Sequence, residues 1–355
     1  MFGRMIRNVT VRYVIGIFGE PAMEAKVELA DHSVGTAVVS KDAFEDPDMI
    51  QGLRPHEQLR SAQSVLRQTV EAAEPLLREW FQGMDGLSQQ KLDQKLTQMI
   101  QEMKVALPAA KRCGSVLMLS VSLAAARAAA QSLGVPLYRY LGGVSADRIP
   151  QPLYAMVEKQ SQDRERLEVL LLPAGNQTLQ ESMYQVTQVW HVLEAILCEA
   201  GVKTGMGRHG IYLHDMKTDE EALEYILRAA EDAGFLPEQD FRLVIPGKNG
   251  IVAKKILEKY PVERIPVPTA GIPEICTVTR ILREARLAGR TSEKLMIGTS
   301  YRETNDSFCA DVAAAVCADY FRIGIPGNGQ GTANINRLLE IANELEQAPL
   351  SRPLL

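Results

Sequence analysis

The chain has 355 residues, of which 46% are hydrophobic and 23% are charged. This composition supports one large folded domain or two ordinary ones, and it excludes a disordered or collagen-like protein. The 39 basic and 44 acidic residues give a net charge of −5, which offers no basic stripe for nucleic acid and no polybasic patch for a membrane.

Three further features of the composition bear on where the protein resides. No window comes near the roughly 18 uninterrupted apolar residues of a membrane span. The first twenty residues alternate as a strand does and lack the apolar core of a secretion signal. The five cysteines are odd in number and scattered, which favours reduced, buried thiols over a disulfide framework. We therefore expect a cytoplasmic protein.

In chain order, the first forty residues predict a three-stranded meander. VTVRYVIGIF, AMEAKVELA and SVGTAVVS alternate in hydrophobicity and are separated by turn residues. From residue 44 to 102, apolar residues recur every three or four positions and predict helices, the first of which we expect Pro75 to split in two. Residues 115–133 are rich in Ala and Leu and precede Gly134, so they form the strongest predicted helix.

Gly142 and Gly143, with the polar run that follows them, mark the expected domain boundary. The first domain, 1–145, is α+β, and the second is 146–355. After Pro150, apolar strands alternate with amphipathic helices, one of them at 251–260, which predicts a parallel sheet covered on its outer face. Five such strands favour a TIM-like β/α barrel over an open sheet, and the barrel is short by at least one βα unit.

In barrels of this type, active residues lie at the C-terminal ends of the strands. We assign Arg302 and Arg322 to the ends of two consecutive predicted strands. A glycine-rich turn with Gly327 and Gly329 then leads into the last helix, where free backbone N–H groups favour phosphate. These residues form a candidate anion site. The alternative is a plain flexible turn, with both arginines bound to Glu303 and Asp306 at the surface.

A magnesium site would need carboxylates that converge from successive strand ends, because Mg²⁺ binds hard oxygen ligands in near-octahedral geometry. The predicted strand ends carry Pro, Gly and Thr instead, and Glu168 is the only strand-borne acid among them. A single carboxylate does not hold the ion. We therefore predict no metal ligands and no cofactor.

Residues 114–143, GSVLMLSVSLAAARAAAQSLGVPLYRYLGG, resemble the helix and exit turn that join the two domains of enolase, phosphopyruvate hydratase. GEPAMEAKVE (19–28), LEVLLLPAG (167–175) and FRIGIP (321–326) continue the resemblance in order over almost the whole chain. It implies a meander-plus-helices α+β domain followed by an enolase-type barrel. It also implies a homodimer that uses Mg²⁺ to convert 2-phosphoglycerate to phosphoenolpyruvate.

Carried over position by position, the resemblance leaves little of the family's catalytic machinery. The first metal-binding Asp falls on Pro246 or Gly247, and the second metal acid falls on Pro266. The third metal Asp and the lysine base belong to strands between Pro268 and Tyr301. That interval is 33 residues, enough for one helix and one strand, so at least one βα unit is missing.

The family's acidic pair aligns with Arg208-His209 and its last substrate-binding lysine with Arg322, while Glu168 matches a family acid. Our hypothesis is an enolase homologue that has lost the dehydration and serves as a scaffold, regulator or small-anion binder. Glu168 and His209 are the candidate catalytic groups. A small phosphorylated or carboxylated metabolite is the expected ligand, held by the arginines. The alternative is an active phosphopyruvate hydratase or a related lyase.

Overall fold

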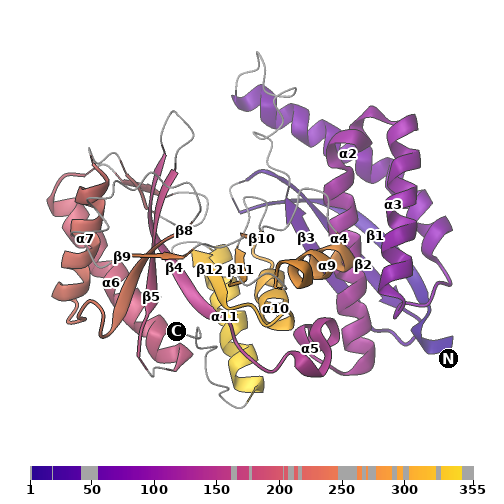
Figure 1. Ribbon diagram of the computed structural model, residues 1–355. Helices are drawn as coiled ribbons and strands as arrows, with labels where there is room; N and C mark the ends of the chain where they lie inside the picture. The colour runs from indigo at the N-terminus through magenta and orange to yellow at the C-terminus, as the bar shows by residue number, and fades with distance from the viewer. Residues whose placement is uncertain are drawn as a thin grey trace. The chain divides into compact units, whose positions relative to one another are not determined.

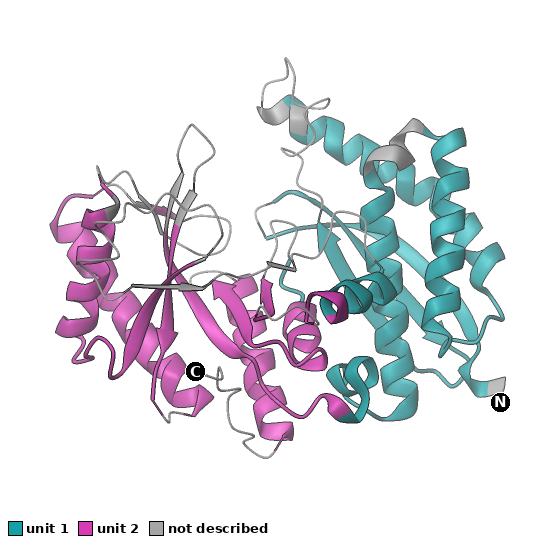
Figure 2. Ribbon diagram, viewed as in Figure 1, with its two compact units in different colours: residues 1–144, 272–285, 300–306 teal, residues 145–271, 286–299, 307–355 magenta. Residues whose placement is uncertain are grey.

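The computed structural model describes residues 2–17, 19–40, 55–160, 166–175, 178–202, 204–206, 212–214, 218–246, 262–265, 269–270, 277–289, 294–298, 304–324 and 329–345. The chain forms two compact units (Figure 2). Unit 1 comprises residues 1–144, 272–285 and 300–306, and unit 2 comprises the rest. Two segments that the sequence analysis assigned to the second domain, 272–285 and 300–306, are therefore grouped with unit 1.

Unit 1 is built on the predicted meander, which the structure confirms. β1 (Ile6–Ile15), β2 (Pro21–Leu29) and β3 (Val34–Ser40) form an antiparallel sheet in the order β1-β2-β3. Alternation along β2 buries Met23, Val27 and Leu29 on one face. The other face carries charged pairs such as Arg12–Glu24, which are cross-strand neighbours. One face therefore packs on the core while the other meets water.

Helices cover the buried face of this sheet (Figure 1). α2 (Pro55–Phe81) and α4 (Pro108–Leu133) contact the strands, and α3 (Gln89–Ala106) packs on α4. The short 3-10 helix η1 (Phe2–Arg4) precedes the first strand. α5 (Leu137–Gly142) is the last helix of the continuous segment 1–144.

The expected break at Pro75 is wrong, because α2 continues through it as one helix. Proline in a helix interior removes one backbone hydrogen bond, and its ring crowds the carbonyl four residues earlier, at a cost of about 3 kcal/mol. Ala73, Leu77 and Phe81 are fully buried on the same helix, so packing on both sides of Pro75 offsets that loss.

α4 is the core helix of unit 1. By length and composition its segment Cys113–Leu133 could cross a membrane, but Ser, Arg and Gln residues interrupt it, and 83% of its apolar window is buried inside the fold, as in the core helix of a folded domain. It ends at Gly134, whose left-handed φ of 66° suits glycine. Gly35 of β3 sits so close to α4 that a Cβ there would overlap the backbone at Ala124 and Ala128.

Unit 2 contains a nine-stranded sheet and the helices that cover it. Its strands are β4 (Gln151–Gln160), β5 (Arg166–Pro173), β6 (Thr204–Met206), β7 (Tyr212–His214), β8 (Phe241–Pro246), β9 (Val262–Ile265), β10 (Thr269–Ala270), β11 (Met296–Gly298) and β12 (Tyr320–Gly324). Its helices are α6 (Leu179–Glu199), α7 (Asp219–Asp232), α10 (Phe308–Ala315) and α11 (Gly329–Glu344). The 3-10 turn η2 (Gly143–Ser145) and α9 (Val278–Ala288) each have residues in both units.

The strand order is β10-β11-β12-β4-β5-β8-β9, with β7 paired to β4 and β6. All five strands predicted for this region are present, as β5, β8, β9, β11 and β12, and β10 falls within the stretch predicted as one strand with β9. β4, β6 and β7 were missed. The expectation of a parallel sheet is wrong at β5, which runs antiparallel to β4 and β8. Only residues 161–165 join β4 to β5, and a parallel crossover needs a dozen or more. The pairings among the described strands follow an open path rather than a closed barrel.

The helices predicted after residue 150 appear as α6, α7, α9, α10 and α11, while the one predicted at 251–260 lies outside the described residues. α6 starts with a capping box between Thr178 and Glu181. Arg337 on α11 binds the buried Asp311 on α10 and holds these two helices together.

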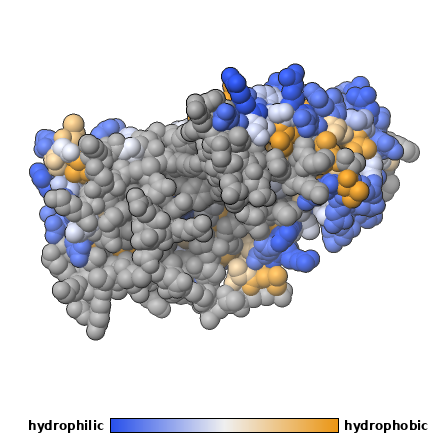
Figure 3. Space-filling model, turned by 90° about the horizontal axis from the view of Figure 1, so that it is seen from above, coloured by the Kyte–Doolittle hydropathy of each residue, from blue (hydrophilic) through white to orange (hydrophobic). Residues whose placement is uncertain are grey.

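On the face in Figure 3, the described surface residues are mostly hydrophilic, with small separate apolar areas.

Candidate functional site

Glu168 and Arg322 meet at the C-terminal end of β4 and β12. Arg322 pairs in register with Leu153 of β4, and Glu168 on β5 pairs with Glu158. Because β5 is antiparallel to β4, a residue near the start of β5 lies at the end where β4 and β12 finish. The sheet topology therefore brings together two side chains that are 154 positions apart.

The two side chains form a partly buried ion pair. Nε and one terminal nitrogen of Arg322 donate to Oε1 of Glu168 at 2.7 and 2.5 Å. Only 12% of the Arg322 side chain and 14% of the Glu168 side chain are exposed. Removing one partner of a buried ion pair leaves an uncompensated charge and lowers the free energy of unfolding by about 3–5 kcal/mol. The pair is thus a fixed feature of this strand end.

Beneath the pair lies an apolar layer on the same face of the sheet. Side chains two positions apart on a strand share a face, so Tyr320 accompanies Arg322 and Leu170 accompanies Glu168. The layer is fully buried and contains Leu153, Ala155, Leu170, Leu172, Val244, Met296 and Tyr320. Solvent only weakly screens an ion pair that lies against such a buried apolar layer.

The remaining predicted site residues do not join this pair within the described structure. Gly329 opens α11 and is exposed, and a Cβ at this position would meet nothing within 4 Å. His209, Arg302 and Gly327 lie outside the described residues. Of the six predicted residues, the structure therefore brings Glu168 and Arg322 together.

Asp306, which we considered as a surface partner for the arginines, instead binds Arg127 within unit 1. Two hydrogen bonds of 2.6 and 2.5 Å join the guanidinium to the carboxylate. Arg127 also donates to the carbonyl of Thr36, and Thr304 donates its hydroxyl to the carbonyl of Val38. The segment around Asp306 is thereby fixed to the free edge of β3. Arg322 has Glu168 as its partner.

A second polar cluster holds the start of α9 in unit 1. The N–H groups of Val278 and Thr279 donate to Ser122 Oγ and Asp93 Oδ2, both at 2.9 Å. Ser122 donates to Asp93 Oδ1 at 2.6 Å, and Gln89 donates to the same oxygen. A helix leaves its first N–H groups without intrahelical partners, so two other helices supply the cap here. The sequence analysis missed this cluster because its members are far apart in the chain.

The residues described at these strand ends do not fit Mg²⁺. Across the described residues, no group of three His, Cys, Asp or Glu side chains is placed to hold a metal ion. The one acid of the candidate site, Glu168, already binds a guanidinium, whose positive charge opposes a divalent cation. Pro246, which ends β8, offers no carboxylate where the resemblance puts a metal ligand, and Pro266, the counterpart of the second metal acid, lies outside the described residues.

Comparison with known families gives the chain its class. Residues 6–141 match the family described as "Enolase, N-terminal domain", and residues 148–246 match "Enolase, C-terminal TIM barrel domain". These matches cover well over half of the chain, which therefore belongs to the enolase family. The second match stops at Pro246, the last residue of β8.

Curated proteins named Enolase align with nearly the whole chain at low identity. The enolase of a Nitratiruptor species is 24% identical, over 96% of this chain and 97% of that protein. The enolase of Acidothermus cellulolyticus is 27% identical, over 97% and 95%, and that of Methanopyrus kandleri is 26% identical, over 97% and 96%.

The first of these alignments also measures how much shorter the chain is. It runs over 413 positions, and 96% of 355 residues fills about 341 of them. The difference between 413 and 341, roughly 70 positions, has no counterpart in this chain. The expectation of a shortened homologue agrees with this deficit.

Proposed function

We propose that this chain is an enolase-family protein that does not dehydrate 2-phosphoglycerate, and that it binds a small phosphorylated or carboxylated anion at the strand ends around Arg322. The observation that carries the proposal is the Glu168–Arg322 ion pair. By resemblance, Glu168 and Arg322 correspond to two family site residues, and a carboxylate bound to a guanidinium is not available as a metal ligand. Catalytic groups that act as a unit fail together when one is lost.

The second candidate function is phosphopyruvate hydratase activity, in which the chain would act as a Mg²⁺-dependent lyase of glycolysis. The alignment with proteins named Enolase over 96–97% of the chain favours it. Under this alternative, residues outside the described ranges would have to supply the metal ligands and the base.

Turnover separates the two candidates. The full chain is mixed with 2-phosphoglycerate and Mg²⁺, and phosphoenolpyruvate is followed by ultraviolet absorbance, with the Acidothermus cellulolyticus enolase as the positive control. We expect no turnover above the rate without protein. Mg²⁺-dependent turnover that disappears on chelation would establish the second candidate instead.

Anion binding is tested with inorganic phosphate and 2-phosphoglycerate by titration calorimetry. Glu168 competes with an anion for the guanidinium, so Glu168→Gln should tighten binding by about tenfold, as expected for a carboxylate removed from a charge-assisted hydrogen bond. Arg322→Met should abolish binding, and Arg7→Met, on the exposed face of the unit 1 sheet, should leave it unchanged. Equal affinity of the wild-type and Arg322→Met proteins would refute the anion site.

By family membership we also propose a cytoplasmic homodimer. Light scattering coupled to size exclusion tests the dimeric state. A monomeric mass over the micromolar concentration range would contradict it.

A further inference from the structure

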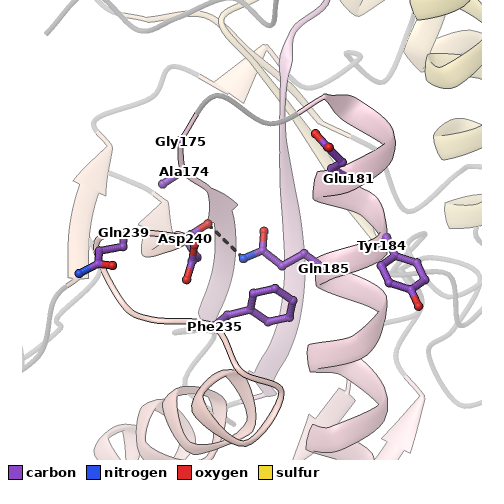
Figure 4. A pocket seen from close by; sticks show the side chains of 8 residues that line it. All are labelled: Ala174, Gly175, Glu181, Tyr184, Gln185, Phe235, Gln239 and Asp240. Carbon is purple, nitrogen blue, oxygen red and sulfur yellow. Dashed lines mark hydrogen bonds between the residues drawn. The ribbon is translucent and has the colours of Figure 1, made fainter.

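Unit 2 has a pocket of about 500 Å³ at the end of the sheet opposite the Glu168–Arg322 pair (Figure 4). It lies where β5 ends and β8 begins, between the first turns of α6 and the loop that follows α7. Gly175, Glu181, Gln185, Phe235 and Asp240 are among the residues that line it. None of these residues belongs to the predicted site.

Gln185 provides an unused hydrogen-bond acceptor in this pocket. Its side chain is 3% exposed, and Nε2 donates to the backbone carbonyl of Asp240 at 3.2 Å. A carbonyl oxygen only accepts, so this bond fixes which end of the amide is nitrogen. Oε1 has no hydrogen-bond partner in the described structure. Figure 4 shows it directed toward the space between Gly175 and Glu181.

Two carboxylates add negative charge to the same pocket. Oε2 of Glu181 accepts from the backbone and the hydroxyl of Thr178 at 2.7 and 2.9 Å, and these hydrogen bonds lower the pKa of Glu181. Oδ2 of Asp240 accepts from the N–H of Leu236 at 2.8 Å. The loop contacts thus engage one oxygen of each carboxylate. Together with Gln185, they give the pocket three groups that accept hydrogen bonds.

The described side chains that line the pocket carry two negative charges and no positive one. The ring of Phe235 lies beside Gln185 and Asp240 (Figure 4), and aromatic faces attract cations. A primary ammonium group has three N–H donors and one positive charge. This combination of acceptors, charge and ring matches an alkylammonium ion.

We propose that this pocket binds a small aliphatic amine as its ammonium ion. The ammonium donates to Oε1 of Gln185 and to Asp240, and its alkyl chain packs on Phe235. The proposal does not depend on the proposed function, because the anion site lies at the other end of the sheet.

Titration of the full-length protein with butylammonium at low ionic strength tests the proposal, with 1-butanol and butyrate as the neutral and anionic matches. Binding is followed by calorimetry. We expect butylammonium to bind at least about tenfold more tightly than butanol, as a charge-assisted hydrogen bond provides, and butyrate not to bind. Butanol that binds as tightly as butylammonium would overturn the proposal.

Variants locate the binding. Asp240→Asn keeps an oxygen for the N–H of Leu236 but removes the charge, and should weaken butylammonium binding about tenfold. Gln185→Leu should weaken it as well. Glu199→Gln, at the exposed end of α6, should bind like the wild type. If Gln185→Leu does not fold, Asp240→Asn and the ligand series still decide, and unchanged affinity in Asp240→Asn contradicts the assignment.

Discussion

The guanidinium of Arg127 and the carboxylate of Asp306 form two hydrogen bonds across 179 residues of chain. Their side chains are only 23% and 12% exposed. Replacing Arg127 by Met keeps the length of the side chain and leaves the Asp306 carboxylate without this partner. We expect the free energy of unfolding in urea to fall by about 3 kcal/mol, since one charge of a buried pair loses its counterpart.

The Arg7–Glu28 pair is the matched control for the Arg127–Asp306 pair, which we call the clamp. It joins two strands at 3.1 Å, but the Arg7 side chain is 57% exposed. Arg7→Met should therefore cost less than about 1 kcal/mol. Equal losses in the Arg127 and Arg7 variants would mean that the clamp contributes no more than a surface pair.

Asp93 should control the stability of the start of α9. Asp93→Ala removes the oxygen that accepts from Thr279 and leaves Ser122 and Gln89 without their shared partner. Loss of such a cap costs about 1–2 kcal/mol. Hydrogen exchange should accelerate at the amides of Val278 and Thr279, while amides in the middle of α6 exchange at the wild-type rate. Wild-type exchange at both α9 amides would show that the cap is not needed.

Gly35 should tolerate no side chain. A Cβ there would lie under 3.0 Å from Ala124, Arg127 and Ala128, and backbone atoms of a packed helix do not yield easily. We expect Gly35→Ala to destabilise the protein by about 3 kcal/mol or more through overpacking. Gly205→Ala, where a Cβ would meet nothing within 4 Å, is the control. Similar melting temperatures for the two variants would contradict the close approach.

Tyr140 contributes to a loss of stability at alkaline pH. Burial, helped by the negative charges of Asp93 and Asp85, raises the pKa of Tyr140 from 10.0 to about 12. The unfolded chain then loses this proton first, so stability is full below pH 10 and falls as the pH rises toward 12. Tyr140→Phe should remove this share of the decline. Urea unfolding at pH 9 and pH 11 measures it, and an unchanged slope in the variant would exclude the effect.

Local pattern was sufficient to predict most elements of the fold. Alternation located β1, β2 and β3, and the Ala-rich composition located α4, because these features depend on which face of a single element is buried. β4 escaped because the polar run before it suggested a linker. The direction of β5 escaped because an apolar strand has the same sequence pattern in parallel and antiparallel sheets.

The candidate site was predicted only in part. Glu168 and Arg322 were selected from strand ends and from resemblance, but the sequence did not show that they bind each other, since this depends on the reversed direction of β5. The Asp93–Ser122 cap and the Gln185 pocket were missed for a related reason. Each joins residues from separate elements, and no local pattern of hydrophobicity records such a meeting.

The discontinuous make-up of unit 1 has a consequence for how the protein is synthesised. Chains emerge from the ribosome from the N-terminus, and domains usually fold as they appear. Here the residues that Asp93 and Arg127 bind are near positions 279 and 306. The first unit therefore cannot reach its final state until most of the polypeptide has been translated, and a gene fragment that stops at codon 144 would encode an unfinished fold.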